Sequence, residues 1–278
     1  MNQCRVLIDA NDETGLVYKV SSVFFNHNLN MVTTSEFVDK ENNKFFMRSV
    51  VDGVTDAKAL KEAIREALPK HANIEVMQPH KKNIIIMATK EMHALGDILI
   101  RHEAGELEAN ILCVISNYNK LESLVSKFDI PYKTISHENL SREEHEQKVL
   151  DCLAEYKDID YIVLAKYMRI LTPNFVDTYP NKIINIHHSF LPAFIGANPY
   201  KQAYDRGVKI IGATSHFVNN NLDEGPIIFQ EVIHINHAYS WREMQRSGKD
   251  VEKVVLARAL KLALEDRIFV YANKTVVF

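Results

Sequence analysis

From residue 83 to the C-terminus, short apolar runs alternate with segments whose apolar residues recur at helical spacing. The apolar runs predict buried strands, and the helical spacing predicts amphipathic helices between them. Strands that alternate with helices form a mostly parallel sheet with helices on both faces. The pattern therefore predicts an α/β fold, with strands at 84–89, 111–116, 131–135, 161–165, 182–186, 210–218 and 227–235, and helices at 91–102, 120–128, 141–156 and 251–268.

Residues 1–80 carry a different pattern, in which two helical segments lie among four apolar runs. The order is strand, helix, strand, strand, helix, strand, which is the ferredoxin-like arrangement. Thr55 and Asp56 are expected to cap the second helix. Proline and charged residues at 78–82 mark a domain boundary. We therefore expect two domains, residues 1–80 and 83–278.

The composition argues against several kinds of partner. Of 278 residues, 46% are hydrophobic and 25% are charged, as in ordinary globular proteins. A net charge of −3 gives no reason to expect nucleic acid or a membrane surface. No apolar run approaches the ~20 residues that span a bilayer, and the N-terminus lacks the pattern of a signal peptide. Cys4, Cys113 and Cys152 are far apart, which favours reduced core thiols in a cytoplasmic protein.

The segment 183–226 carries the candidate catalytic residues. Its first strand ends in Asn185 and His187, which alternation along a strand points to the same side. The carboxyl ends of parallel strands face the crevice where ligands bind. The next strand leads to Asp223. An amide donor, an imidazole and a carboxylate can together polarise a carbonyl and transfer protons, which predicts carbonyl chemistry with water or an amine as nucleophile.

Simpler interpretations of these residues are also open. His187 and His188 could ligate a metal, but adjacent strand residues point in opposite directions and the chain has no HExxH motif, so we expect no metal. We expect His188 to be structural. Ser189 does not lie in a nucleophile elbow, so no covalent intermediate is expected. The segment 223–226 could be an ordinary acidic turn.

Four long strings resemble the formyltetrahydrofolate deformylase family: IINIHHSFLPAF at 183–194, GANPYKQAYDRGVKIIGATSHFV at 196–218, LDEGPII at 222–228 and NKTVVF at 273–278. In that family an ACT domain precedes a Rossmann-like, folate-dependent formyltransferase domain. The resemblance covers essentially the whole chain. It implies hydrolysis of 10-formyltetrahydrofolate to tetrahydrofolate and formate, which supplies one-carbon metabolism and purine biosynthesis.

The resemblance also implies the roles of individual residues. Asn185 is expected to hold the formyl oxygen, Asp223 to orient or deprotonate water, and His187 to protonate the leaving nitrogen. No cofactor is expected besides the folate substrate. An amino-acid effector at the ACT domain and a homo-oligomer are further expectations. A folate pocket, bound mostly through backbone groups, is expected at Met168, Arg169, Ile170, Leu171, Val218, Asn219 and Leu222.

Two other functions are compatible with these residues. One is a formyltransferase that uses an amine such as glycinamide ribonucleotide, and the other is an inactive folate-binding regulator. A ribonucleotide acceptor needs a phosphate site, usually a glycine-rich turn after the first strand. Here that turn is Thr89-Lys90-Glu91, with no glycine before Gly96 and a negative charge at Glu91. This turn favours water as the acceptor.

Overall fold

The computed structural model describes residues 3–54, 56–193 and 199–278, which form two compact units. One unit contains the residues up to His80 together with Val276–Phe278, and the other contains Lys81–Thr275. Among the described helices, none has both the length and the apolar character needed to cross a bilayer.

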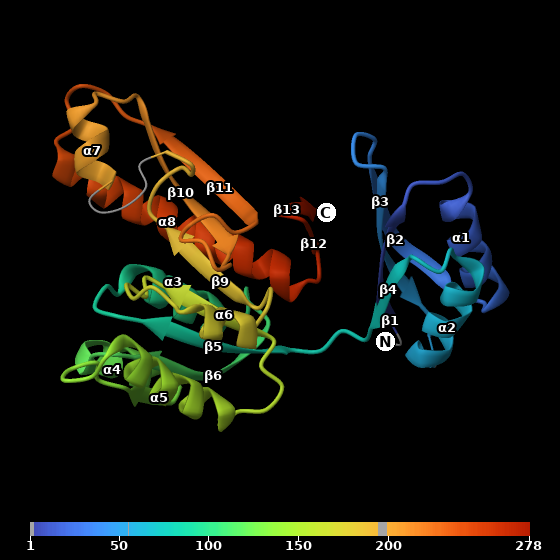
Figure 1. Cartoon of the computed structure of the whole chain (residues 1–278), viewed down its shortest axis with the longest axis horizontal. Helices are drawn as coiled ribbons and strands as arrows, with labels where there is room; N and C mark the ends of the chain where they lie inside the picture. Colours follow the sequence, from blue (N-terminus) through green and yellow to red (C-terminus); the bar gives the residue numbers. More distant parts are fainter. Residues whose placement is uncertain (1–2, 55, 194–198) are drawn as a thin grey trace. The chain divides into compact units, whose positions relative to one another are not determined.

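The N-terminal unit is a four-stranded antiparallel sheet with the strand order β2-β3-β1-β4. Helices α1 and α2 cover one face of this sheet (Figure 1). The predicted ferredoxin-like order is confirmed. Asp56 caps α2 by accepting hydrogen bonds from the backbone of Lys58 and Ala59, whereas Thr55 lies outside the described residues. The elements are β1 (Gln3–Asn11), α1 (Leu16–Asn26), β2 (Asn30–Asp39), β3 (Lys44–Asp52), α2 (Ala57–Ala67) and β4 (Asn73–Met77).

The second unit is built on a seven-stranded sheet with the order β11-β10-β9-β8-β5-β6-β7. The neighbouring strands β9, β8, β5, β6 and β7 are parallel to one another, whereas β10 and β11 are antiparallel to their neighbours. The predicted mostly parallel sheet is therefore confirmed. Its strands are β5 (Lys82–Ala88), β6 (Ala109–Ser116), β7 (Tyr132–Thr134), β8 (Tyr161–Ala165), β9 (Ile183–His187), β10 (Ile210–Phe217) and β11 (Ile227–His234).

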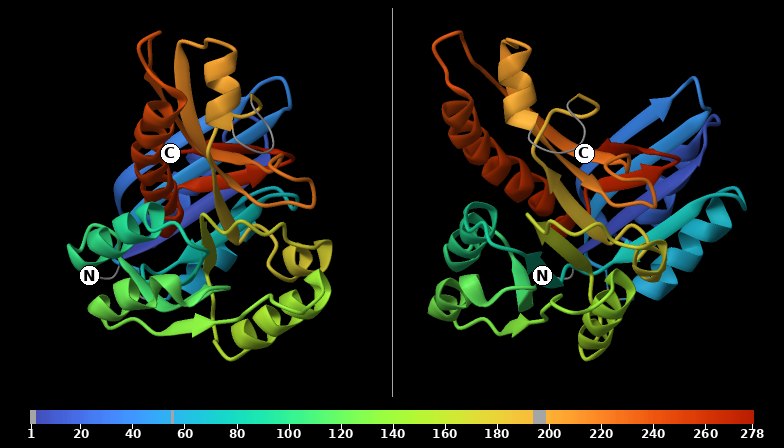
Figure 2. Two further views of the ribbon diagram at one scale, coloured as in Figure 1. Left: turned by 90° about the vertical axis from the view of Figure 1, so that its left-hand side faces the viewer. Right: turned by 60° about the vertical axis from the view of Figure 1, so that its left-hand side comes forward.

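Helices cover both faces of this sheet. The apolar side chains of β5 point alternately to the two faces, so both faces need a covering layer. Ile84 and Ile86 belong to one buried cluster with α3 and α8, and Ile85 and Met87 belong to another with α5 and α6. Figure 2 shows these helices on the two sides of the sheet. The helices are α3 (His93–Glu103), α4 (Glu122–Val125), α5 (Arg142–Ala154), α6 (Pro173–Thr178), α7 (Pro199–Asp205) and α8 (Trp241–Leu264).

Some boundaries differ from the prediction for local reasons. The last helix, expected at 251–268, runs from Trp241 to Leu264 because Ser240 and Glu243 form a capping box at its start. The segment 120–128 is divided among η1 (Asn119–Leu121), α4 and η2 (Ser126–Phe128). The short helices α6 and α7 and a C-terminal hairpin, β12 (Ile268–Tyr271) with β13 (Lys274–Val277), were not predicted.

Candidate active site

A cavity of about 500 Å³ lies at the carboxyl end of β8 and β9. The first strand of the unit, β5, has β6 on one side and β8 on the other, so the strand order reverses there. In open α/β sheets, ligands bind outside the strand ends at such a switch point. Residues that follow β8, residues of β9 and β10, the loop after β10, and helices α7 and α8 line the cavity.

Asn185 and His187 both line this cavity, as alternation along β9 predicts. Asp223 arrives by a different route from the one expected. β10 runs antiparallel to β9, with His216 opposite Asn185 and Thr214 opposite His187, so β10 ends at the far edge of the sheet. The loop after β10 therefore turns back along β9 and brings Asp223 beside His187. Asp223 itself has a left-handed backbone, with φ of 57°.

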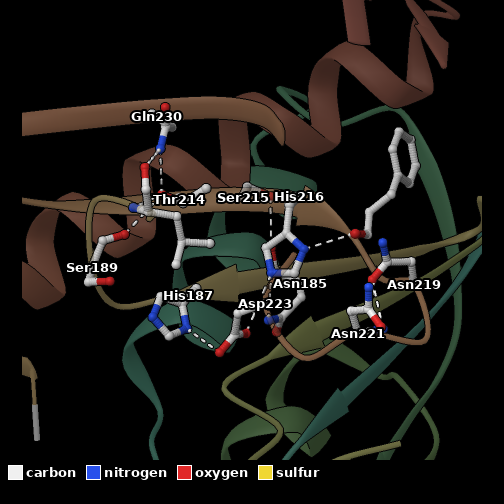
Figure 3. Close-up of polar contacts among 12 residues, drawn as sticks. Asn185, His187, Ser189, Thr214, Ser215, His216, Asn219, Asn221, Asp223 and Gln230 are labelled. Carbon is white, nitrogen blue, oxygen red and sulfur yellow. Dashed lines mark hydrogen bonds and ion pairs between the residues drawn. The ribbon is translucent and has the colours of Figure 1, made fainter. Parts of the chain in front are cut away.

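The catalytic candidates form direct contacts. His187 Nδ1 lies 3.2 Å from Asp223 Oδ2 (Figure 3). The carboxylate accepts the Nδ1 proton and so fixes the orientation of the imidazole ring. His187 Nε2 is buried and has no hydrogen-bond partner among the described residues. A buried polar atom without a partner calls for an explanation, and a nitrogen that exchanges protons with a bound substrate provides one.

His216 is a site residue that the sequence analysis missed. Its Nδ1 donates to the Phe217 carbonyl at 2.8 Å. In the neutral ring Nε2 accepts from Asn185 Nδ2 at 3.2 Å, whereas in the protonated ring the proton on Nε2 gives His216 a positive charge that acts on Asp223. This contact orients the Asn185 amide and leaves its second hydrogen for another acceptor. The same Nε2 lies 3.7 Å from Asp223 Oδ1. Alternation along β10 carried a signal for this residue, but only the register between β9 and β10 places it opposite Asn185.

The surroundings keep Asp223 ionised. Burial alone would raise the pKa of this carboxyl, but hydrogen bonds and charge interactions with His187 and His216 outweigh burial and hold the pKa well below its ordinary value. The carboxylate is therefore available at neutral pH to hold a protonated His187 and to orient a polar ligand. The acidic-turn interpretation of 223–226 does not account for these contacts.

The neighbouring residues take other roles. His188 follows the end of β9, so its ring also lines the cavity, 5.0 Å from the His187 ring, and does not point away as expected for an adjacent strand residue. Burial, and then the charge of Lys166, lower the pKa of His188 to about 4. The Ser189 hydroxyl donates to the Ala193 carbonyl at 2.7 Å. In the described part of the chain, no three His, Cys, Asp or Glu side chains are grouped so that they could hold a metal.

The structure brings all seven expected folate-pocket residues to this cavity. They lie on two loops, which we call the folate loops, at 168–171 and 218–222. Glu146 on α5 anchors the first loop by accepting hydrogen bonds from the backbone N–H and the hydroxyl of Thr172. Arg142 donates to the Leu171 carbonyl at 2.7 Å. In the second loop, the Asn219 side chain accepts a hydrogen bond from the backbone N–H of Asn221 at 3.0 Å, which closes a turn.

Known proteins resemble the chain along its whole length. Residues 82–260 match the family model described as formyl transferase. The chain is 53% identical to the formyltetrahydrofolate deformylase of Haemophilus influenzae, over 98% of each chain. The crystal structure of a formyltetrahydrofolate deformylase from Pseudomonas syringae is similar with a TM-score of 0.94 and 42% identity, covering 99% of this chain and 94% of that chain.

Transferases resemble a smaller part of the chain. Glycinamide ribonucleotide transformylase 1 from Symbiobacterium toebii is similar with a TM-score of 0.67 and 28% identity, covering 72% of this chain and 95% of that chain.

Proposed function

This chain belongs to the formyltetrahydrofolate deformylase family, and from that premise we propose that it hydrolyses 10-formyltetrahydrofolate to tetrahydrofolate and formate. The observation that carries the proposal is the convergence of Asn185, His187 and Asp223 on one cavity, where His187 Nε2 has no hydrogen-bond partner within residues 3–54, 56–193 and 199–278. The formate would supply one-carbon metabolism and purine biosynthesis.

Each member of the trio has a role that its contacts support. Asn185, oriented by His216, donates its second amide hydrogen to the formyl oxygen as negative charge develops there. Asp223 orients the water and, together with His187, takes one of its protons. His187 delivers a proton from Nε2 to the leaving nitrogen. The C–N bond breaks, the water oxygen remains on the formyl carbon, and formate leaves with no covalent enzyme intermediate.

The turn after β5 supports water as the acceptor. Glu91 is paired with Lys249 at 2.8 Å, and the Lys90 ammonium lies over the Tyr118 ring at 4.0 Å from its centre. The Thr89 hydroxyl donates to the Lys166 carbonyl at 2.7 Å. A phosphate at this turn would meet the Glu91 carboxylate. The transferase alternative is therefore not favoured, in agreement with the full-length relatives.

The balance of products tests this proposal. Purified protein given 10-formyltetrahydrofolate alone should produce formate and tetrahydrofolate in equal amounts. A formate assay measures the first product, and absorbance measures the second. Folate binding with no formate above the uncatalysed rate would support the inactive regulator instead.

We assign the chemistry to residues 83–278 and regulation or assembly to residues 1–80, with an amino-acid effector and homo-oligomer formation. An exposed strand supports assembly: β2 lies at the edge of its sheet, and Val32 and Phe37 are 47% and 46% exposed. Edge strands offer unpaired backbone groups to a second sheet.

We place the reaction in the cytoplasm, which three buried, unpaired cysteines support.

A further inference from the structure

A buried carboxylate that the proposed mechanism does not use lies in the same cavity. Glu252 on α8 is 1% exposed and lines the cavity. It accepts a hydrogen bond from the Tyr200 hydroxyl at 2.7 Å, and it pairs with His93 Nε2 at 2.8 Å and Lys166 Nζ at 3.2 Å. Buried carboxylates are rare unless they are paired, so three partners from three separate segments of the chain indicate a built site.

The pairing continues to the cavity rim. The other ring nitrogen of His93 lies 3.3 Å from Glu91, and Glu91 pairs with Lys249 at 2.8 Å. Burial would lower the pKa of His93, but its contacts with Glu252 and Glu91 outweigh burial and raise it. Two carboxylates thus face two ammonium groups and the His93 imidazole. We call these six side chains, Glu91, His93, Lys166, Tyr200, Lys249 and Glu252, the Glu252 network.

The backbone is shaped to hold this network. Gly248 lies one turn before Glu252 on α8, and a Cβ atom there would come within 2.2 to 2.3 Å of the Tyr200 ring. The absence of a side chain at Gly248 thus lets the ring lie against the helix and reach Glu252. Lys166, directly after β8, has a left-handed backbone with φ of 61°, a conformation that non-glycine residues adopt only when their surroundings require it.

Five of the six members of the Glu252 network, all except His93, line the same cavity as the folate loops and the catalytic trio. The His188 ring connects the network and the trio, at 5.0 Å from the His187 ring and 6.1 Å from the Tyr200 ring. If the folate loops hold the pterin, a nucleophile must reach the formyl carbon from elsewhere in the cavity. The part that the Glu252 network lines is where a second substrate would lie.

We propose that the Glu252 network makes this enzyme a hydrolase by occupying the acceptor side of the cavity, so that water reaches the formyl carbon and amines do not. An amine acceptor carries polar groups that need partners, and here the buried donors and acceptors are already paired with one another. An entering amine would either break those pairs or leave its own polar groups without partners. Both outcomes cost free energy and therefore oppose binding of the amine strongly. The inference rests on the proposed hydrolysis. It identifies the Glu252 network as the feature that selects water over an amine in a fold that transferases share.

The partition of the formyl group between water and an amine tests this inference. The full-length protein is given 10-formyltetrahydrofolate with a large excess of glycinamide, and mass spectrometry quantifies formate and N-formylglycinamide. Wild type should yield formate with no enzyme-dependent formylated amine. Tyr200→Ala, which opens space, and Glu252→Gln, which removes the charge, should each raise the ratio of formylated amine to formate roughly 10- to 100-fold above the uncatalysed background.

Tyr204→Ala is the matched control, because Tyr204 lies one turn later on α7 and its ring is 45% exposed. It should keep the wild-type ratio. If Tyr200→Ala does not fold, Tyr200→Phe removes only the hydroxyl that Glu252 accepts, and a smaller rise is expected. An unchanged ratio in folded Glu252→Gln and in either Tyr200 variant would overturn the inference, as would formylation of glycinamide by wild type. Absence of formate in wild type would instead contradict the proposed function.

Discussion

Asp223 lies on a loop that follows a strand running away from the catalytic edge, and yet its carboxylate faces the imidazoles of His187 and His216. Sequence alternation was enough to predict Asn185 and His187 as neighbours, because both lie on one strand. It was not enough to find His216, because the pairing between β9 and β10 depends on a register that local patterns do not fix.

Asp223→Asn and Asn185→Ala test the residue roles most simply. Each should lower kcat by ~10²–10³, the usual effect of losing a group that stabilises charge in the transition state, while folate affinity changes little. Single-turnover kinetics and equilibrium titration of folate measure the two quantities separately. Asp250→Asn, whose exposed carboxylate pairs with Lys253 on α8, should behave as wild type. Turnover near the wild-type rate in Asp223→Asn would rule out its proposed role.

His216→Phe should change the pH dependence of the reaction. Burial raises the pKa of Asp223, and the imidazoles of His187 and His216 lower it further than burial raises it. With His216 gone, the pKa of Asp223 rises. Because the proposed mechanism uses the Asp223 carboxylate, activity should be lost as pH falls through this pKa, and the acid limb of the kcat/KM profile should move to higher pH. An acid limb that stays in place would mean that His216 does not act on Asp223.

At the scale of elements, the sequence predicted every strand of the main sheet but not the short helices α6 and α7. Strands such as β5 carry continuous apolar runs that need no tertiary information. Helices α6 and α7 have six and seven residues, too few for a periodic pattern, and tertiary packing stabilises them. The start of α8 carried a readable signal in its Ser240 and Glu243 capping box, which the prediction overlooked.

Glu146→Gln tests whether α5 positions the first folate loop. Glu146 is 7% exposed and accepts two hydrogen bonds from Thr172, directly after residues 168–171. A glutamine keeps the size of the side chain but removes its charge, so the loop should loosen. KM for folate should rise roughly tenfold with kcat nearly unchanged. This is the effect of losing an interaction that stabilises the bound substrate and the transition state equally. Glu143→Gln, exposed on the same helix, is the control. A fall in kcat at constant KM would contradict a positioning role.

At the scale of the whole molecule, the two units have separate buried clusters, and all three members of the trio belong to the second unit. Each unit thus has a core of its own, as expected of domains that fold separately. Composition and pattern predict a boundary at residues 78–82, because the linker carries proline and charge and no apolar periodicity. The grouping of Val276–Phe278 with the first unit was not predicted.

A shortened chain that begins at Lys81 should still bind folate with an affinity within about tenfold of the full-length protein, since its pocket residues all lie beyond that point. Isothermal titration of the soluble fragment with a folate ligand measures this directly, and circular dichroism establishes that it is folded. A folded fragment that fails to bind would show that residues 1–80 contribute to the site, and would contradict our assignment of the chemistry.

The central claim is that the acceptor is water, and competition between acceptors tests it most directly. Formate release from 10-formyltetrahydrofolate is followed with purified full-length protein, with and without saturating glycinamide ribonucleotide. We expect the same rate of formate formation in both reactions, and no formylated ribonucleotide. Loss of the formyl group that depends on the ribonucleotide, with little formate in its absence, would contradict the account and identify the protein as a transferase.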